Sequence, residues 1–242
     1  MTITEPSLPS TGASDATDGR LARAGGAAAL LAAATFGFGI TMFATSLADY
    51  TDPDATPAAS VEFLVDHQGT LLAWYLGIFI VFGAALVPLG LALRRRLAPS
   101  TPVLADTAAV FVAIWAALMF ATGMISNIGI EAVADLAETD PASAPALWSS
   151  IDTVTNGLGG GNEIVGGLWI LLISIAGLLS SRLPRWLNLV GVITGVAGAA
   201  TVVPGLEPVE MAFGLGSIVW FVGVGVVLLR SHDSSGAGGV AS

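Results

Sequence analysis

Six long apolar stretches, separated by short polar segments, constrain the fold of this chain more than any other feature. With polar interface residues included at their ends, they cover about 25–47, 71–93, 103–128, 162–181, 186–203 and 209–229. A helix needs about 20 residues to cross the hydrocarbon core of a bilayer, and short stretches reach that length where the interface accepts polar or tryptophan residues. The predicted fold class is therefore all-α, a polytopic membrane protein formed by a six-transmembrane-helix bundle.

Composition supports the same class and bounds the membrane domain. Hydrophobic residues make up 54% of the 242 residues and charged residues only 11%, whereas a soluble domain carries about 25% charged residues. Residues 1–20 and 231–242 are rich in small and polar residues, so we expect disordered cytoplasmic tails there. A single membrane domain is predicted over 21–230.

The positions of the arginines predict the orientation. All eight basic residues are arginines and flank the apolar stretches on one side only, at Arg20, Arg23, Arg94, Arg95, Arg96, Arg182, Arg185 and Arg230. Because basic loops stay in the cytoplasm, we expect a plasma-membrane protein with both termini cytoplasmic. Thirteen of the 18 acidic residues then lie outside. Two explanations stay open: acids occupy loops that orientation does not require to be basic, or the exterior attracts cations.

The two long external loops are expected to hold short helices at the membrane surface. The first offers Ser60 as an N-cap, and the second contains predicted helices near 130–138 and 144–154. A glycine run, Gly157–Gly161, follows them and is expected to be a flexible hinge into the fourth membrane helix.

Several kinds of chemistry lack the residues they need. The chain has no cysteine and no lysine, which excludes disulfides, thiolate metal sites and Schiff bases. With two histidines in the chain, a haem held by a histidine pair is not expected, and no cofactor or metal is predicted. The scattered arginines form no basic face, so nucleic acid is not an expected partner.

Two glutamates are the candidate ligand-binding residues. Glu163 and Glu210 each stand at the outer end of a membrane helix and begin a stripe of small residues that should face other helices. Asn162 and Asn127 could complete a polar mouth beside them. The rival explanation is helix-end chemistry, because an acid near a helix N-terminus gains about 0.3–1 kcal/mol from the helix dipole.

Two sequence segments resemble a known family. They are GGLWILL at Gly166–Leu172 and SRLPRWLNLVG at Ser181–Gly191. Both resemble the second half of a prokaryotic multi-pass membrane family that is catalogued as a domain of unknown function. That family often has Leu-Pro-Arg-Trp-Leu-Gly in the corresponding cytoplasmic turn, and here Asn188 replaces the glycine. The resemblance covers mainly the last three helices and implies a six- or seven-helix membrane protein, with no known activity.

Three functions are compatible with these patterns. The first is a non-enzymatic membrane protein, either structural, regulatory or a partner subunit, in contact with the lipid bilayer and with a helix-mediated homo-oligomer or membrane partner. The second is a small-solute or cation facilitator with an acidic external mouth. The third is an externally facing enzyme in which Glu163, Glu210, Asp152 and His67 converge. No ionisable residue lies near a helix midplane, which counts against proton-coupled transport.

Overall fold

Helices account for every regular element that the structure describes. The computed structural model describes residues 11–48, 50, 55–160, 163–203 and 207–236. The long helical segments are α1 (Thr11–Ala44), α4 (Phe82–Leu97), α5 (Pro102–Thr139), α7 (Ile164–Ser180), α8 (Arg185–Ala200) and α9 (Glu207–Gly236). The shorter ones are α2 (Pro57–Asp66), α3 (Gln68–Tyr75), α6 (Ala144–Thr155) and two π-helical segments, η1 (Leu76–Val81) and η2 (Asn156–Gly160).

The helices have the length and apolarity of membrane spans. Five qualify by these criteria, at Ala16–Ala44, Gln68–Leu97, Pro102–Thr139, Ala144–Ser180 and Val209–Arg230. The sixth apolar helix, α8, has 16 residues. In the second span, α3, η1 and α4 form one continuous helix. The helical backbone begins at Thr11 and ends at Gly236, so part of each expected tail is helical and the rest lies outside the described residues.

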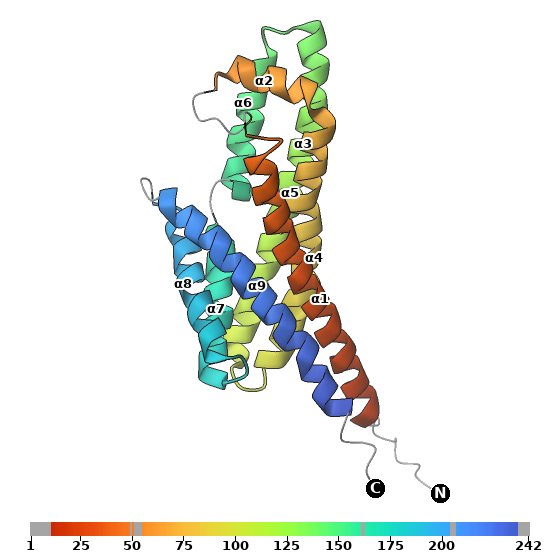
Figure 1. Cartoon of the computed structure of the whole chain (residues 1–242), viewed down its shortest axis with the longest axis vertical. Helices are drawn as coiled ribbons and strands as arrows, with labels where there is room; N and C mark the ends of the chain where they lie inside the picture. Colours follow the sequence, from red (N-terminus) through yellow and green to blue (C-terminus); the bar gives the residue numbers. More distant parts are fainter. Residues whose placement is uncertain (1–10, 49, 51–54, 161–162, 204–206, 237–242) are drawn as a thin grey trace, which may run out of the picture.

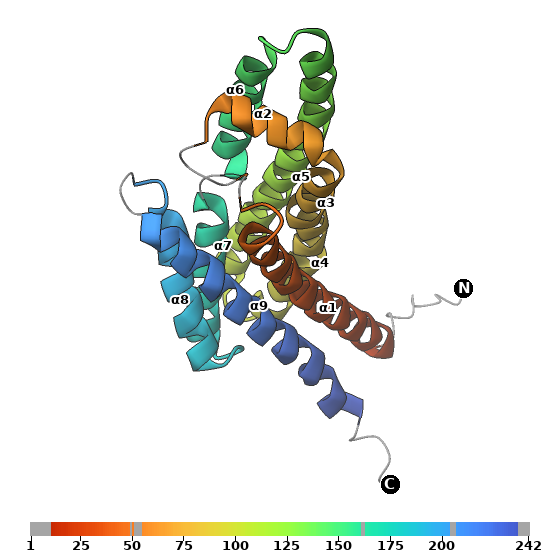
Figure 2. The same ribbon diagram turned by 45° about the horizontal axis from the view of Figure 1, so that its top comes forward.

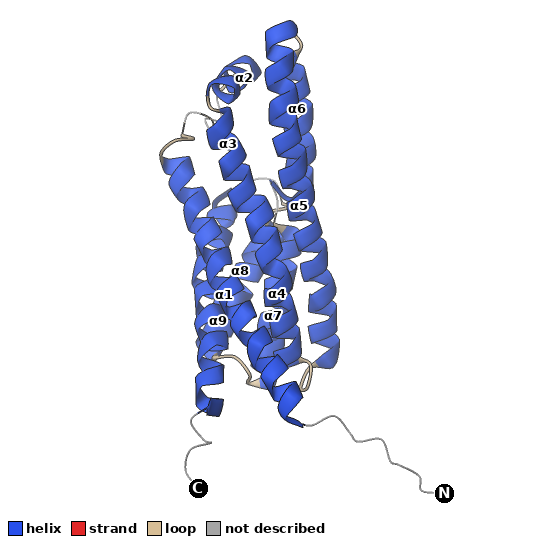
Figure 3. Cartoon of the chain, turned by 90° about the vertical axis from the view of Figure 1, so that its right-hand side faces the viewer, coloured by secondary structure: helices blue, strands red, loops and turns tan. Residues whose placement is uncertain are grey.

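The long helices form a closed ring in chain order. Contacts join α1 to α4, α4 to α5, α5 to α7, α7 to α8, α8 to α9, and α9 back to α1. Figure 3 shows these helices running side by side along the length of the molecule. Successive long helices run in opposite directions, as in an up-and-down bundle, and the connections after α1 and α5 carry α2 and α6 (Figure 1).

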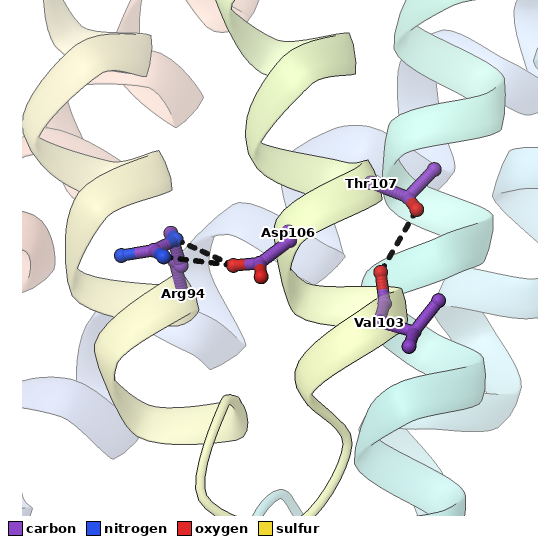
Figure 4. A network of polar contacts seen from close by, with 4 residues as sticks. All are labelled: Arg94, Val103, Asp106 and Thr107. Atoms are coloured by element: carbon purple, nitrogen blue, oxygen red, sulfur yellow. Dashed lines mark hydrogen bonds and ion pairs between the residues drawn. The ribbon is translucent and has the colours of Figure 1, made fainter.

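One end of the ring, which we call the arginine end, gathers the basic residues. The start of α1, the end of α9 and the α4–α5 and α7–α8 turns all lie at this end (Figure 1). Arg96 Nε donates to the Arg182 carbonyl oxygen over 3.0 Å and joins the two turns. Two acids of this end form ion pairs with arginines. Arg95 Nε lies 2.9 Å from Asp18 Oδ1. Arg94 Nη2 lies 2.8 Å from Asp106 Oδ1, and Figure 4 shows this second pair.

The opposite end carries a cap made of α2 and α6, packed beside the end of α5 (Figure 2). The prediction of a separate helix at 130–138 was wrong, because α5 continues to Thr139 without a break. Gly129 does not interrupt it, since Ile151 of α6 packs on its bare face, 2.9 Å from where a Cβ would lie. The prediction of α6 near 144–154 is confirmed.

The N-cap predicted in the first external loop was also wrong. Helix α2 begins at Pro57, and Thr56 Oγ1 accepts a hydrogen bond from Ala59 N at 3.3 Å. Proline fits the first position of a helix, because its missing N–H needs no partner there. Ser60 lies one turn later and donates to the Thr56 carbonyl oxygen.

The centre of the ring is filled by aromatic side chains. Five of them, one from each of five helices, contact one another in a closed cycle: Phe36, Phe82, Trp115, Trp169 and Phe221. Successive ring centroids are 5.3, 5.0, 5.8, 6.3 and 6.0 Å apart. We call this cycle the aromatic belt. Four of its members are almost fully buried, so the belt closes the middle of the bundle.

The seam between α1 and α9 widens away from the arginine end. Near that end a Cβ on Gly26 would lie 3.1 Å from the Gly225 carbonyl oxygen, so the two backbones are close. Further along the seam the rings of Phe36 and Phe213 separate the helices, with centroids 6.3 Å apart. The two helices diverge toward the cap in the ribbon views (Figures 1 and 2). The change from glycine to phenylalanine along the seam explains the divergence.

Candidate functional site

A cavity of about 560 Å³ lies between the aromatic belt and the cap, and we call it the inner cavity. Its walls come from the cap-side ends of α1 and α9, the α3–η1–α4 helix, α5, η2 and Glu163 just before α7. Phe36 and Phe82 of the aromatic belt form its floor, beside Phe213. The cavity is therefore closed toward the arginine end, and most of its lining is apolar.

Glu163 brings a carboxylate into these apolar surroundings. The residue is the N-cap of α7, and its Oε2 atom is buried without a hydrogen-bond partner among the described residues. Its backbone N–H donates to Thr201 Oγ1 at 2.9 Å, and that hydroxyl donates to the Gly198 carbonyl oxygen at 2.8 Å. Thr201 thus ties the beginning of α7 to the end of α8, which holds Glu163 at the cavity wall.

Glu210 lines the same cavity from α9 and is itself exposed. The structure therefore brings together the two glutamates that the sequence analysis selected. Asn127 lies on α5 and does not line the inner cavity, although its Oδ1 atom is buried without a hydrogen-bond partner among the described residues. Asn162 lies outside the described residues.

The inner cavity opens sideways, between α1 and α9. Ile40 and Phe43 on α1, and Met211 and Leu215 on α9, line the cavity and are also exposed on the outer surface of the bundle. Gly214 lies between the last two, and a Cβ added to it would have no atom within 4 Å. A molecule in the surrounding apolar phase could reach the cavity by this opening.

A second, smaller cavity lies under the cap, and we call it the outer cavity. It has a volume of about 300 Å³ and lies between α2, α3, α5 and α6. Tyr50 and Tyr75 line it with their hydroxyl oxygens 3.2 Å apart. Burial, and then the neighbouring Tyr75, raises the pKa of the Tyr50 hydroxyl, which stays protonated. Asp152 of α6 also lines this cavity and accepts a hydrogen bond from Asn156 Nδ2 at 3.0 Å.

The residues proposed for an external enzyme are not brought together. Glu163 and Glu210 line the inner cavity, whereas Asp152 lines the outer one. His67 lines neither, and its exposed ring stacks on Phe63 with centroids 4.1 Å apart. No group of three or more His, Asp or Glu residues placed to hold a metal ion occurs among the described residues.

Aromatic side chains are the feature of both cavities that no sequence pattern indicates. Phe43, Trp74 and Phe79 line both cavities and form the partition between them. Trp74 is held edge-on against Phe43, with centroids 5.0 Å apart. Aromatic faces attract cations through their quadrupole, and a carboxylate adds a full negative charge. The chemistry of both cavities therefore favours an organic cation over an anion.

Comparison with known proteins gives a family and no further relative. A family model described as a domain of unknown function (DUF4386) matches residues 24–231. The match includes the first three membrane helices, which the resemblance in Gly166–Gly191 did not reach. No curated protein and no solved structure matches the sequence.

Proposed function

This chain belongs to the DUF4386 family, and we propose that it is a non-enzymatic membrane protein that binds an amphipathic organic cation in the inner cavity. We also propose that the chain crosses the plasma membrane six times. Both termini and the arginine end then lie in the cytoplasm. The sidedness of the arginines supports this orientation. The inner cavity then faces the outer leaflet.

The buried carboxylate of Glu163 carries the proposal. A carboxyl in apolar surroundings keeps a negative charge only where an opposite charge or hydrogen bonds offset a cost of several kcal/mol, and otherwise it takes up a proton. Oε2 of Glu163 has no such partner among the described residues, and Glu210 adds a like charge that acts on the same group. A bound cation would supply the missing compensation.

The other walls of the inner cavity indicate an amphipathic ligand. Phe43, Trp74 and Phe79 offer aromatic faces to a cationic group. Ile40 and Leu215 line the same cavity and offer apolar contact at the side opening. Small-molecule sites commonly combine such an apolar lining with a few polar groups that fix orientation. Entry between α1 and α9 would suit a molecule that partitions into the membrane.

The closed floor favours binding over conduction. The aromatic belt separates the inner cavity from the arginine end, and its members Trp115, Trp169 and Phe221 are almost fully buried. A facilitator would have to displace these rings in every transport cycle. The facilitator remains the second candidate function, supported by the acidic rim at Glu210, and it predicts ligand flux across proteoliposomes in addition to binding.

Tetraphenylphosphonium tests the proposal, because it is an apolar cation of the stated class. We expect the protein in lipid nanodiscs to bind it in a titration calorimeter and not to bind tetraphenylborate, an anion of similar shape. Glu163→Gln should weaken binding about tenfold, which corresponds to about 1.4 kcal/mol. Glu131→Gln is the matched control, because Glu131 is exposed on α5 and lines neither cavity. Equal affinity of Glu163→Gln and the wild type would show that the carboxyl takes no part in binding.

A pair of glycine variants tests, independently of charge, whether the ligand binds in the inner cavity. Gly214→Phe should place a ring in the inner cavity and abolish tetraphenylphosphonium binding, since Gly214 lines the cavity and a Cβ added there meets no atom within 4 Å. Gly37→Phe is its control, since a Cβ there also meets no atom within 4 Å, and Gly37 does not line the cavity. Loss of binding in both variants, or in neither, would exclude the inner cavity as the binding site.

A further inference from the structure

More than half of the residues that line the outer cavity are aromatic. Six of its lining residues are aromatic, and they come from α1, the loop before α2, α3, η1 and α6: Phe43, Tyr50, Trp74, Tyr75, Phe79 and Trp148. Trp74, Tyr75, Phe79 and Trp148 are buried. Tyr50 contacts Trp148 with ring centroids 6.4 Å apart, and Tyr75 stacks on Phe79 at 5.7 Å. Rings that surround a small space on several sides form an aromatic cage.

One carboxylate accompanies the cage. Asp152 is partly buried, and it lies close enough to the Tyr50 and Tyr75 hydroxyls to act on both electrostatically. Asn156 donates one hydrogen bond to Oδ2. No ion pair involves Asp152 among the described residues. The external loops 48–70 and 129–161 contain no arginine, and the chain has no lysine. The negative charge of Asp152 therefore has no cationic side chain to compensate it within this end of the molecule.

Two buried polar atoms in the cavity wall also lack partners. Trp74 Nε1 and Thr122 Oγ1 form no hydrogen bond among the described residues, and both residues line the outer cavity. Thr122 is fully buried and Trp74 is 5% exposed. An unsatisfied buried donor destabilises a protein, because it loses its hydrogen bond to water without gaining another. A ligand that carries an oxygen atom could accept hydrogen bonds from these groups and remove part of that cost.

We propose that the outer cavity binds a small quaternary ammonium ion with a hydroxyl-bearing arm, the chemistry of choline. The methylated ammonium group sits among the aromatic faces, which attract it through their quadrupoles without requiring hydrogen bonds. Asp152 supplies the compensating negative charge, and Trp74 and Thr122 bind the hydroxyl of the arm. Six of the eleven residues that line the cavity are aromatic, which favours a methylated ammonium ion over a metal ion.

The outer cavity is a separate site, and the ligand proposed for it does not depend on a ligand in the inner cavity. The two cavities share the partition of Phe43, Trp74 and Phe79, but the carboxylates differ, with Asp152 in the outer cavity and Glu163 in the inner one. The ligands differ too, because the outer cavity is about half as large and its lining is more polar. Variants of the two carboxylates therefore separate the two proposals.

The test compares choline with its neutral carbon analogue, 3,3-dimethylbutan-1-ol, on the wild-type protein in nanodiscs. The two molecules have the same shape, so the comparison measures the contribution of the positive charge. We expect choline to bind at least tenfold more tightly in titration calorimetry. Equal affinity, or no binding of choline at millimolar concentration, would overturn the proposal, and neither result depends on the folding of a variant.

Variants then locate the site. Asp152→Asn should weaken choline binding about tenfold, because it removes the charge and keeps the shape and most of the hydrogen bonding. Trp148→Leu should weaken it by a similar factor by removing one face of the cage. Glu163→Gln should leave choline binding unchanged and is the control for the inner cavity. Unchanged binding in folded Asp152→Asn protein would contradict the proposal, as would an equal loss in Glu163→Gln.

Discussion

The backbones of α7 and α8 meet at Gly167 and Gly195, where neither residue leaves room for a side chain. A Cβ on Gly195 would lie 2.7 Å from the Gly167 carbonyl oxygen, and a Cβ on Gly167 would lie 2.7 Å from the Gly195 carbonyl oxygen. Gly198 continues the contact, since its Cβ position lies 2.9 Å from Gly167 Cα. Close backbone approach of this kind is how helices associate in a membrane, where apolar burial alone gives little preference for a protein neighbour.

Gly195→Leu should therefore destabilise the protein. The new side chain would have to displace backbone atoms of α7, and we expect the free energy of unfolding to fall by about 1–3 kcal/mol. Val196→Leu is the control, because Val196 is 53% exposed on the adjacent side of α8. Thermal unfolding in detergent measures both variants. Equal melting temperatures would show that α8 can move away from α7 at no cost.

Single cysteines test the orientation, and the cysteine-free chain provides no background. Ser143, which precedes α6, and Ser100, in the α4–α5 turn, are both exposed. The start of α6 and the α4–α5 turn lie at opposite ends of the bundle (Figure 1). Ser143→Cys should react with a membrane-impermeant maleimide in intact cells, and Ser100→Cys only after lysis. The reverse pattern would mean that the arginine end is external.

The arginine cluster at the end of α4 should matter for orientation more than for stability. The Arg94–Asp106 pair is 2.8 Å long, but its side chains are 48% and 58% exposed, and exposed pairs contribute about 0.2–1 kcal/mol. Asp106→Asn should therefore change the melting temperature little. Replacing Arg94, Arg95 and Arg96 together with glutamine should yield a mixed orientation in the Ser143→Cys labelling assay. If every molecule of that variant still labels at Ser143→Cys in intact cells, the remaining arginines are enough to set the orientation.

Thr201 should act as a positioning residue for Glu163. Its hydroxyl accepts the Glu163 N–H and donates to the Gly198 carbonyl oxygen. Thr201→Val keeps the shape and removes both hydrogen bonds, so tetraphenylphosphonium affinity should fall several-fold. Thr153→Val is the control, since Thr153 is exposed on α6 and bonds only within its own helix. Unchanged affinity in Thr201→Val would mean that the helix geometry alone holds Glu163.

The candidate site was partly predictable because its glutamates obey rules that act along the chain. Glu163 and Glu210 stand at helix ends and begin small-residue stripes, and the structure places both on one cavity. Asn127 satisfies a similar pattern on α5, yet it lies away from that cavity. The stripe shows only that a residue faces another helix. Which helix it faces depends on how the ring closes, and no local pattern contains that information.

Hydropathy alone determined that this chain is all-helical, with several helices long enough for a membrane, because backbone groups in an apolar phase must be satisfied within each segment. Charge alone placed the arginines on one side of those helices. Only the tertiary structure decided that Phe36, Trp115 and Trp169 fill the centre and that Trp74 and Trp148 line cavities. The physical reason is that lipid is as apolar as a protein core, so an apolar aromatic residue is equally stable facing either. Whether such an aromatic residue faces lipid or the bundle interior therefore depends on which helices pack together, and the small residues of neighbouring helices determine that packing.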